Sequence, residues 1–171
     1  YSSASNLVQG DTNYVNDVFL YDIQNQQTFR VSVASDGSQA NSYSDLPAIS
    51  ADGRFVAFYS FASNLVEGDT NNTADVFVHD HQTGLTELVS RTWYGGAANN
   101  ECDVPSLSAD GRYVAYYSYA SNLVLGDTNG FTDVFRYDRL LHTTVRVSLG
   151  EWLQQGAHDS LCSTISADGN L

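Results

Sequence analysis

The chain repeats itself every 58 residues, and this regularity limits its fold more than any other feature. Tyr1, Tyr59 and Tyr117 open three copies at intervals of 58 residues, and the copies align without an insertion. The segment ASNLVEGDTNNTADVF, which starts at Ala62, has close counterparts that start at Ala4 and Ala120. A fixed period of this kind is typical of proteins that stack one structural unit many times. We therefore divide the chain into repeats 1–58, 59–116 and 117–171.

Each period predicts four short β-strands and no helix. In the middle of the chain we expect the strands at residues 45–50, 55–61, 75–81 and 85–91. The Asp52-Gly53 turn between the first two is a strong hairpin signal. Four strands joined by hairpins make an antiparallel sheet, and such sheets arranged radially make a β-propeller. The alternative all-β architecture is a β-solenoid, whose rungs are shorter and would not supply three hairpin turns per period.

Two segments resemble a known repeat family. LPAISADGRFVAF, followed by DVFVHDHQTGLTELVS, is similar to the TolB-like (PD40, WD40-like) propeller repeat. The resemblance covers nearly all of the chain and implies an all-β propeller of four-stranded antiparallel blades. The chain departs from the family pattern in two ways. Ala51 and Ala109 stand where the family usually has proline, and the loop between the second and third strands is longer than usual.

Three blades do not close a ring, since propellers have about four to eight. Open sheet faces would expose large apolar patches. We therefore expect either half of a six-bladed ring, completed by a second copy in a homodimer, or an excerpt of a longer propeller.

The charge of the chain and its lack of a long apolar run each argue against one kind of interaction. The formal net charge is -13, with sixteen Asp, four Glu and no lysine. Phosphates would be repelled, so nucleic acid is not expected as a partner. No run of 18 apolar residues is present, so we expect no membrane insertion. We expect an extracellular, periplasmic or cell-surface protein.

The loop between the second and third strands carries oxygen-bearing side chains at fixed offsets in every copy. Calcium takes about six to eight oxygens from carboxylates, amides, carbonyls and water. We therefore expect about one Ca²⁺ per repeat, with these ligands: Asp11, Asn13 and Asp17; Asp69, Asn71 and Asp75; Asp127, Asn129 and Asp133. The alternative interpretation is that Asp and Asn hydrogen-bond their own backbone in Asx turns. Repetition does not separate the two, because duplication copies structural residues and ligands alike.

Other chemistry-bearing residues give weaker signals. His79 and His81 lie two apart on one expected strand and could chelate a metal, although exposed surface pairs are commoner. Cys102 and Cys162 could form a bridge, but two buried free thiols are the plainer interpretation. No GxSxG segment and no Ser/His/Asp grouping suggests a nucleophile, so we assign no catalytic residue.

Large aromatic residues break the repeat in the variable links between blades. Trp93 and Tyr94 lie in one link, and Trp152 lies in another. Such side chains can stack on sugar rings, contact a protein partner or cap the edge of a blade. We therefore expect a non-enzymatic binding or scaffold module with calcium-binding loops. One alternative is a carbohydrate-binding propeller lectin that uses these links. Another is the accessory propeller of a secreted hydrolase, as in relatives of the family.

Overall fold

Antiparallel hairpins build every sheet of the computed structural model, which describes residues 1–170. The N-terminal sheet has two strands, β1 (Phe19–Asp22) and β2 (Gln27–Arg30). The middle sheet has β3 (Ser44–Ile49), β4 (Phe55–Ser60), β5 (Asp75–Asp80) and β6 (Leu85–Leu88). The C-terminal sheet has β7 (Cys102–Leu107), β8 (Tyr113–Ser118), β9 (Asp133–Asp138) and β10 (Thr143–Arg146). The all-β expectation is confirmed.

The strands of both larger sheets follow one another in sequence order, as hairpins require. Within residues 1–170, the one helical element is a single 3-10 turn, η1 (Glu151–Leu153). The expected fourth strand, 85–91, is shorter than predicted because its pairing with β5 ends at Leu88. The N-terminal sheet is also smaller than the four strands expected per repeat. Ahead of β1, Ser2 makes only an isolated bridge to Asp17.

A β-bulge interrupts the first strand of each larger sheet at its proline. The register between β3 and β4 shifts between Asp45 and Ala48, and Pro47 lies inside that shift. Proline cannot donate to a ladder, so it is confined to edge strands and bulges. The corresponding shift in β7, between Asp103 and Ser106, surrounds Pro105 in the same way. The two prolines of the chain therefore lie where an edge strand tolerates them.

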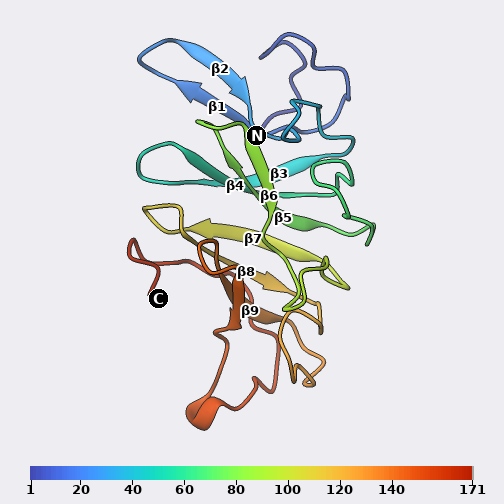
Figure 1. The fold of residues 1–171 in the computed structure, drawn as a ribbon, viewed down its shortest axis with the longest axis vertical. Helices are drawn as coiled ribbons and strands as arrows, with labels where there is room; N and C mark the ends of the chain where they lie inside the picture. Colours follow the sequence, from blue (N-terminus) through green and yellow to red (C-terminus); the bar gives the residue numbers. More distant parts are fainter. Residues whose placement is uncertain (171) are drawn as a thin grey trace.

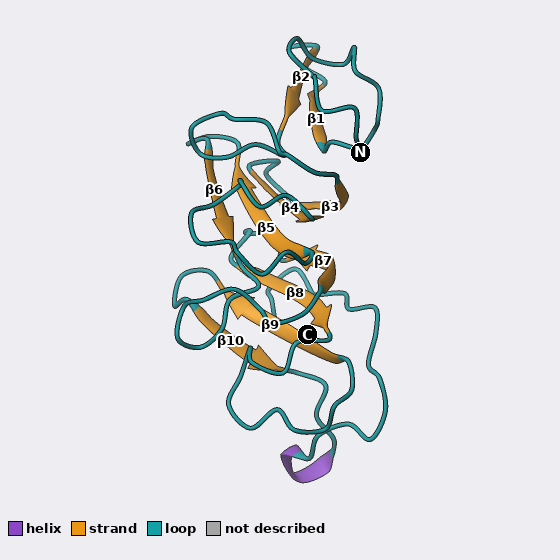
Figure 2. Ribbon diagram, turned by 90° about the vertical axis from the view of Figure 1, so that its right-hand side faces the viewer, coloured by secondary structure: helices purple, strands orange, loops and turns teal. Residues whose placement is uncertain are grey.

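The sheets follow one another along the long axis of the molecule, from the N-terminal sheet to the C-terminal sheet (Figure 1). Figure 2 shows the same succession from the side, with β6 and β10 at corresponding edges of their sheets. Because successive sheets face each other, the middle sheet is covered on both sides. All six residues of β5 are buried.

Alternation of side chains along β4 and β5 supplies both cores. Phe58 and Phe77 pack into the cluster shared with the N-terminal sheet. Ala57, Val76 and Val78 pack into the cluster shared with the C-terminal sheet. Successive residues of a strand point to opposite faces, so apolar residues at nearly every position are what a doubly covered sheet requires.

A repeated backbone hydrogen bond links the Asp-Gly turns of neighbouring repeats. Ala51 N donates to the carbonyl of Ala109 at 2.9 Å, and Ala109 N donates to the carbonyl of Ala167 at the same distance. Where the turns of Ala51 and Ala109 meet, Gly111 has a φ of +71° and lies against the ring of Phe55. A Cβ at this position would stand 2.2 Å from Phe55 Cδ2. Glycine is required here by both backbone conformation and space.

We predict that Gly111→Ala destabilises the chain by about 1–3 kcal/mol more than Gly53→Ala, because overpacking adds to the cost of the positive φ. Gly53 is the matched control: its φ is +75°, but no atom lies within 4 Å of an added Cβ. Denaturant unfolding of both variants measures the difference. Equal losses of stability in the two variants would mean that the close approach of Phe55 to Gly111 does not restrict the residue at position 111.

Candidate functional site

The acidic loop of the middle repeat is organised by Asn71. Its Oδ1 accepts a hydrogen bond from the backbone N of Thr73 at 3.1 Å. Its Nδ2 donates to Asp75 Oδ2 at 2.6 Å and to the carbonyl of Ala98 at 3.0 Å. The backbone donor and the carbonyl acceptor together fix the orientation of the amide group. Asn13 and Asn129 make the corresponding bonds in the other repeats.

Asp75 starts β5 and is completely buried. Its Oδ1 accepts a hydrogen bond from Ser90 Oγ at 2.6 Å, and the backbone N of Val76 donates to the same hydroxyl. Asp17 with Ser32, and Asp133 with Ser148, repeat this arrangement. The buried carboxylate therefore ties the loop to the end of the following strand in all three repeats.

An arginine neutralises the carboxylates in the first and third repeats. Arg146 Nη1 lies 3.0 Å from Asp127 Oδ1 and 3.2 Å from Asp133 Oδ2. Arg30 Nη1 lies 3.4 Å from Asp11 Oδ1 and 3.6 Å from Asp17 Oδ2. These side chains are nearly buried, so removing one charge would leave the others poorly solvated.

A glutamine completes each of these two charged networks. Gln39 Nε2 donates to Asp11 Oδ1 at 3.1 Å. In the third repeat Gln155 Oε1 accepts from Arg146 Nη1 at 3.1 Å, and its Nε2 donates to the carbonyl of Gly126 at 2.7 Å. Arginine and glutamine thus act together on one side of the loop.

The middle repeat lacks both of these residues. At the positions of the arginine and the glutamine, 58 residues from their counterparts, stand Leu88 and Ala97. Asp69 is only 7% exposed, and among residues 1–170 its carboxylate has no ion pair and no side-chain hydrogen-bond partner, only the backbone N of Asn71. The carboxylates of this repeat are buried without a cation.

Burial accordingly raises the pKa of Asp75 to about 7, against the hydrogen bonds from Ser90 and Asn71, which lower it. Burial also raises the pKa of Asp69. It raises that of Asp127 too, although Arg146 opposes the change. Because the folded-state pKa of Asp75 is above its ordinary value of 3.8, its contribution to stability is complete below that value. The contribution is lost as the pH rises through about 7.

The structure brings the nine expected metal ligands together in their three loops, but as hydrogen-bonded Asx turns. Each asparagine turns a donor, not an acceptor, toward the shared aspartate. In two repeats a guanidinium occupies the space between the carboxylates. Within residues 1–170, no group of three or more His, Cys, Asp or Glu side chains is arranged to hold a metal ion. Ca²⁺ takes about six to eight oxygens, so the expectation of about one Ca²⁺ per repeat stays a prediction.

Four residues that complete the charged networks of the first and third repeats were not predicted from the sequence: Arg30, Arg146, Gln39 and Gln155. The signal was available, because Arg30, Leu88 and Arg146 occupy equivalent positions in the three copies. A charge present in two copies and absent from the third marks a place where the surroundings of the acidic loops differ.

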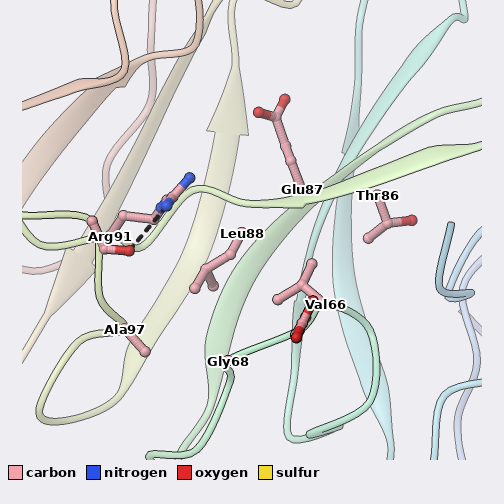
Figure 3. A pocket seen from close by; sticks show the side chains of 9 residues that line it. Val66, Gly68, Thr86, Glu87, Leu88, Arg91 and Ala97 are labelled. Carbon is pink, nitrogen blue, oxygen red and sulfur yellow. Dashed lines mark hydrogen bonds between the residues drawn. The ribbon is translucent and has the colours of Figure 1, made fainter.

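A cavity of about 310 Å³ lies beside the acidic loop of the middle repeat, lined by Gly68, Leu88, Ala97, Glu87 and Arg91 among others. Figure 3 shows Leu88 and Val66 directed toward its interior, with Ala97 and Gly68 along one side and Arg91 at one end. Arg91 Nη2 donates to the carbonyl of Gly95 at 2.9 Å. We call this space the β6 cavity, because it opens along β6.

The expected aromatic ligand residues fall into two groups. Trp93 and Tyr94 lie edge to face with ring centroids 5.2 Å apart, and both are about 60% exposed. They line a second cavity of about 400 Å³ with Arg91, Tyr137 and His142. Trp152 lies in η1, is 90% exposed and lines none of the cavities described here.

The remaining candidate residues have structural environments. His79 is buried and shares a hydrogen bond with Thr86 Oγ1 at 2.9 Å, so the expectation of an exposed pair with His81 is wrong. Burial lowers the pKa of His79 and favours its neutral form. Cys102 and Cys162 are both free thiols. Cys102 is buried as expected, whereas Cys162 is exposed.

Comparisons with known proteins identify the fold. No protein-family model and no curated protein matches the sequence. Solved structures with similar folds include TolB from Acinetobacter baumannii, at 17% identity and a TM-score of 0.51, covering 90% of this chain and 30% of that one. A TolB-type protein of Agrobacterium tumefaciens matches at 17% identity and a TM-score of 0.53, covering 93% of this chain and 49% of that one. A prolyl endopeptidase matches at 15% identity and a TM-score of 0.53, covering 90% of this chain and 21% of that one.

The fold is therefore that of a TolB-like β-propeller, and the chain spans at most about half the length of these structures. In residues 1–170 there is no helix with the length and hydropathy needed to cross a bilayer.

We predict that Arg146→Leu, which gives the third repeat the middle repeat's residue, costs about 3 kcal/mol or more at pH 8. The loss should be smaller at pH 5, because protonation of the abandoned carboxylates relieves the unpaired charge. Urea unfolding at both pH values measures it. Arg54→Leu is the control, since Arg54 pairs with Asp80 at a more exposed site and its removal should cost much less. A loss from Arg146→Leu that does not change with pH would show that Arg146 acts through packing alone.

Proposed function

We propose that this TolB-like propeller segment is a non-enzymatic binding module whose ligand lies against Trp93 and Tyr94. The observation that carries the proposal is the pairing of two exposed aromatic rings with a cavity of about 400 Å³. Exposed tryptophan and tyrosine side chains lose little conformational entropy when they bind, and they are enriched where ligands are held.

The lining of this cavity favours a carbohydrate. Tyr137 OH and His142 Nδ1 are hydrogen-bonded at 3.0 Å, and Arg91 and Thr92 add polar groups beside the rings. A sugar ring offers one apolar face for stacking and hydroxyl groups for the polar side. The cavity presents both kinds of surface within one site, as binding sites for small polar ligands do.

The position of the site also fits the proposal. Trp93 and Tyr94 lie in the link between β6 and β7, where the residue types differ from copy to copy, so they do not belong to the packing that all copies share. Loops held on a rigid scaffold carry function more often than the scaffold itself.

We predict that the chain binds members of a glycan array and that Trp93→Ala/Tyr94→Ala weakens this binding about tenfold or more. Trp152→Ala is the control, because it removes an even more exposed tryptophan that lines neither of the two cavities. Thermal melts of the three proteins check that all of them are folded. Retained binding by the double variant would move the ligand away from this link, and a wild-type chain that binds no glycan would refute the carbohydrate assignment.

A further inference from the structure

The β6 cavity lies beside the positions at which the other two repeats carry an arginine and a glutamine. Leu88 and Ala97 line it at those two positions. Gly68 lines it as well, and the counterpart of Gly68 in the first repeat, Gly10, accepts a hydrogen bond from Arg30 Nη2 at 3.3 Å. The cavity is therefore lined by the counterpart of a glycine that contacts a guanidinium in the first repeat.

The middle repeat keeps the acidic residues that bind the arginine in the other two repeats. Asp69 and Asp75 keep the positions of Asp127 and Asp133, and Asn71 and Ser90 hold Asp75 as their counterparts hold Asp133. Asp69 is more than nine-tenths buried and has neither an ion pair nor a side-chain partner among the described residues. Two buried carboxylates without a cation are unfavourable unless a proton or a bound cation neutralises them.

The sister repeats show which cation this arrangement accepts. In the third repeat a single guanidinium nitrogen lies within 3.2 Å of both carboxylates. A planar guanidinium offers several donors in a fixed geometry that matches carboxylates, and it is more weakly hydrated than an ammonium group. The asparagine of the loop turns its amide nitrogen toward the shared aspartate, which suits a cation bound by two carboxylates and not a metal that needs many oxygens.

We propose that the middle repeat binds a guanidinium group supplied from outside the chain, which enters the β6 cavity and pairs with Asp69 and Asp75. The ligand class is an arginine side chain of a partner, or a free guanidino compound, and both present the same chemistry. Glu67 lines the cavity as a further acidic residue, whereas the carboxylate of Glu87 is paired with Arg139.

Arg91 is a positively charged residue that lines the β6 cavity, and its charge competes there with an incoming guanidinium group. Its guanidinium lines the β6 cavity but donates to the carbonyl of Gly95, and it has no ion pair with Asp69 or Asp75 in the structure. The corresponding residues of the other repeats are Val33 and Leu149, so this arginine belongs to the middle repeat alone. Replacing it by glutamine removes a positive charge that opposes an incoming cation.

The test uses N-acetyl-L-arginine amide as the probe and N-acetyl-L-citrulline amide as its neutral isostere. Both are titrated into the isotopically labelled chain at pH 8 and low salt, and the amide resonances of Gly68, Leu88 and Ala97 are followed by NMR. We expect saturable shifts with the arginine amide and affinity at least about tenfold weaker for the citrulline amide, since the neutral isostere forms no charge-assisted pair. Arg91→Gln should strengthen binding of the arginine amide.

Leu88→Arg/Ala97→Gln is the decisive variant, because it installs the residues with which the other two repeats already fold. It should abolish the shifts. Leu85→Arg is the matched control: it adds the same charge to β6 at an exposed position outside the cavity and should leave binding in place. Asp69→Asn, nearly isosteric, should also abolish binding, and it keeps the test valid if the double variant does not fold.

Three results would overturn the proposal. The two amides could bind equally, Leu88→Arg/Ala97→Gln could bind as the wild type does, or CaCl₂ could produce the saturable shifts at these residues while the arginine amide does not. The last result would assign the site to a divalent metal. Because Leu88→Arg/Ala97→Gln and Asp69→Asn change no residue that lines the Trp93–Tyr94 cavity, failure here is separate from failure of the carbohydrate assignment.

Discussion

The middle sheet is buried on both faces, and the rest of the structure depends on that constraint. Every residue of β5 is buried, so its side chains alternate between two cores without a solvent-facing side. The two aspartates that begin and end β5 must then find partners within the protein. Asp80 pairs with Arg54 through two hydrogen bonds at the outer end. Asp75, at the other end, receives only neutral donors.

Within this fold, the sequence repeat gives two different electrostatic environments. The loops of all three repeats hold their carboxylates with the same asparagine and serine, so duplication has preserved the framework. The first and third repeats add a guanidinium, and the middle repeat adds none. Buried carboxylates are costly to ionise without a partner. In the middle repeat, where Leu88 stands in place of the arginine, burial raises the pKa of Asp75 and a cavity lies beside the loop. Both proposed binding sites, the β6 cavity and the Trp93–Tyr94 link, lie where the residues of the three copies differ.

The fold could be predicted from the sequence because its signals are local and recur. Asp-Gly turns, alternating apolar strands and a fixed period of 58 residues give the hairpins, and hairpins in sequence give the sheet order. Strand ends were less predictable. Val89 N still donates to the carbonyl of Val76, but the regular pairing with β5 ends at Leu88 and the backbone turns beyond it, where Arg91 N donates to the carbonyl of Val89.

The site was harder to predict because its chemistry depends on contacts distant in the sequence. Arg146 reaches Asp127 and Asp133 from a different strand, and no local pattern links them. The expectation of calcium came from the types of residue in the loops. The atom that each asparagine turns toward the aspartate, and the arginine beside the carboxylates of two repeats, depend on tertiary contacts. Burial is likewise a tertiary property. It explains why His79 lies inside the sheet and Cys162 outside the core, which residue type alone did not reveal.

The middle repeat keeps a buried carboxylate without a cation of its own. Carbon-13 NMR titration of the aspartate side chains measures this directly. The account predicts that Asp75 in the free chain titrates near pH 7, far above its ordinary pKa of 3.8, and that added N-acetyl-L-arginine amide lowers this pKa. A free chain in which Asp75 titrates at its ordinary value would contradict the account, because the carboxylate would then already be neutralised or solvated.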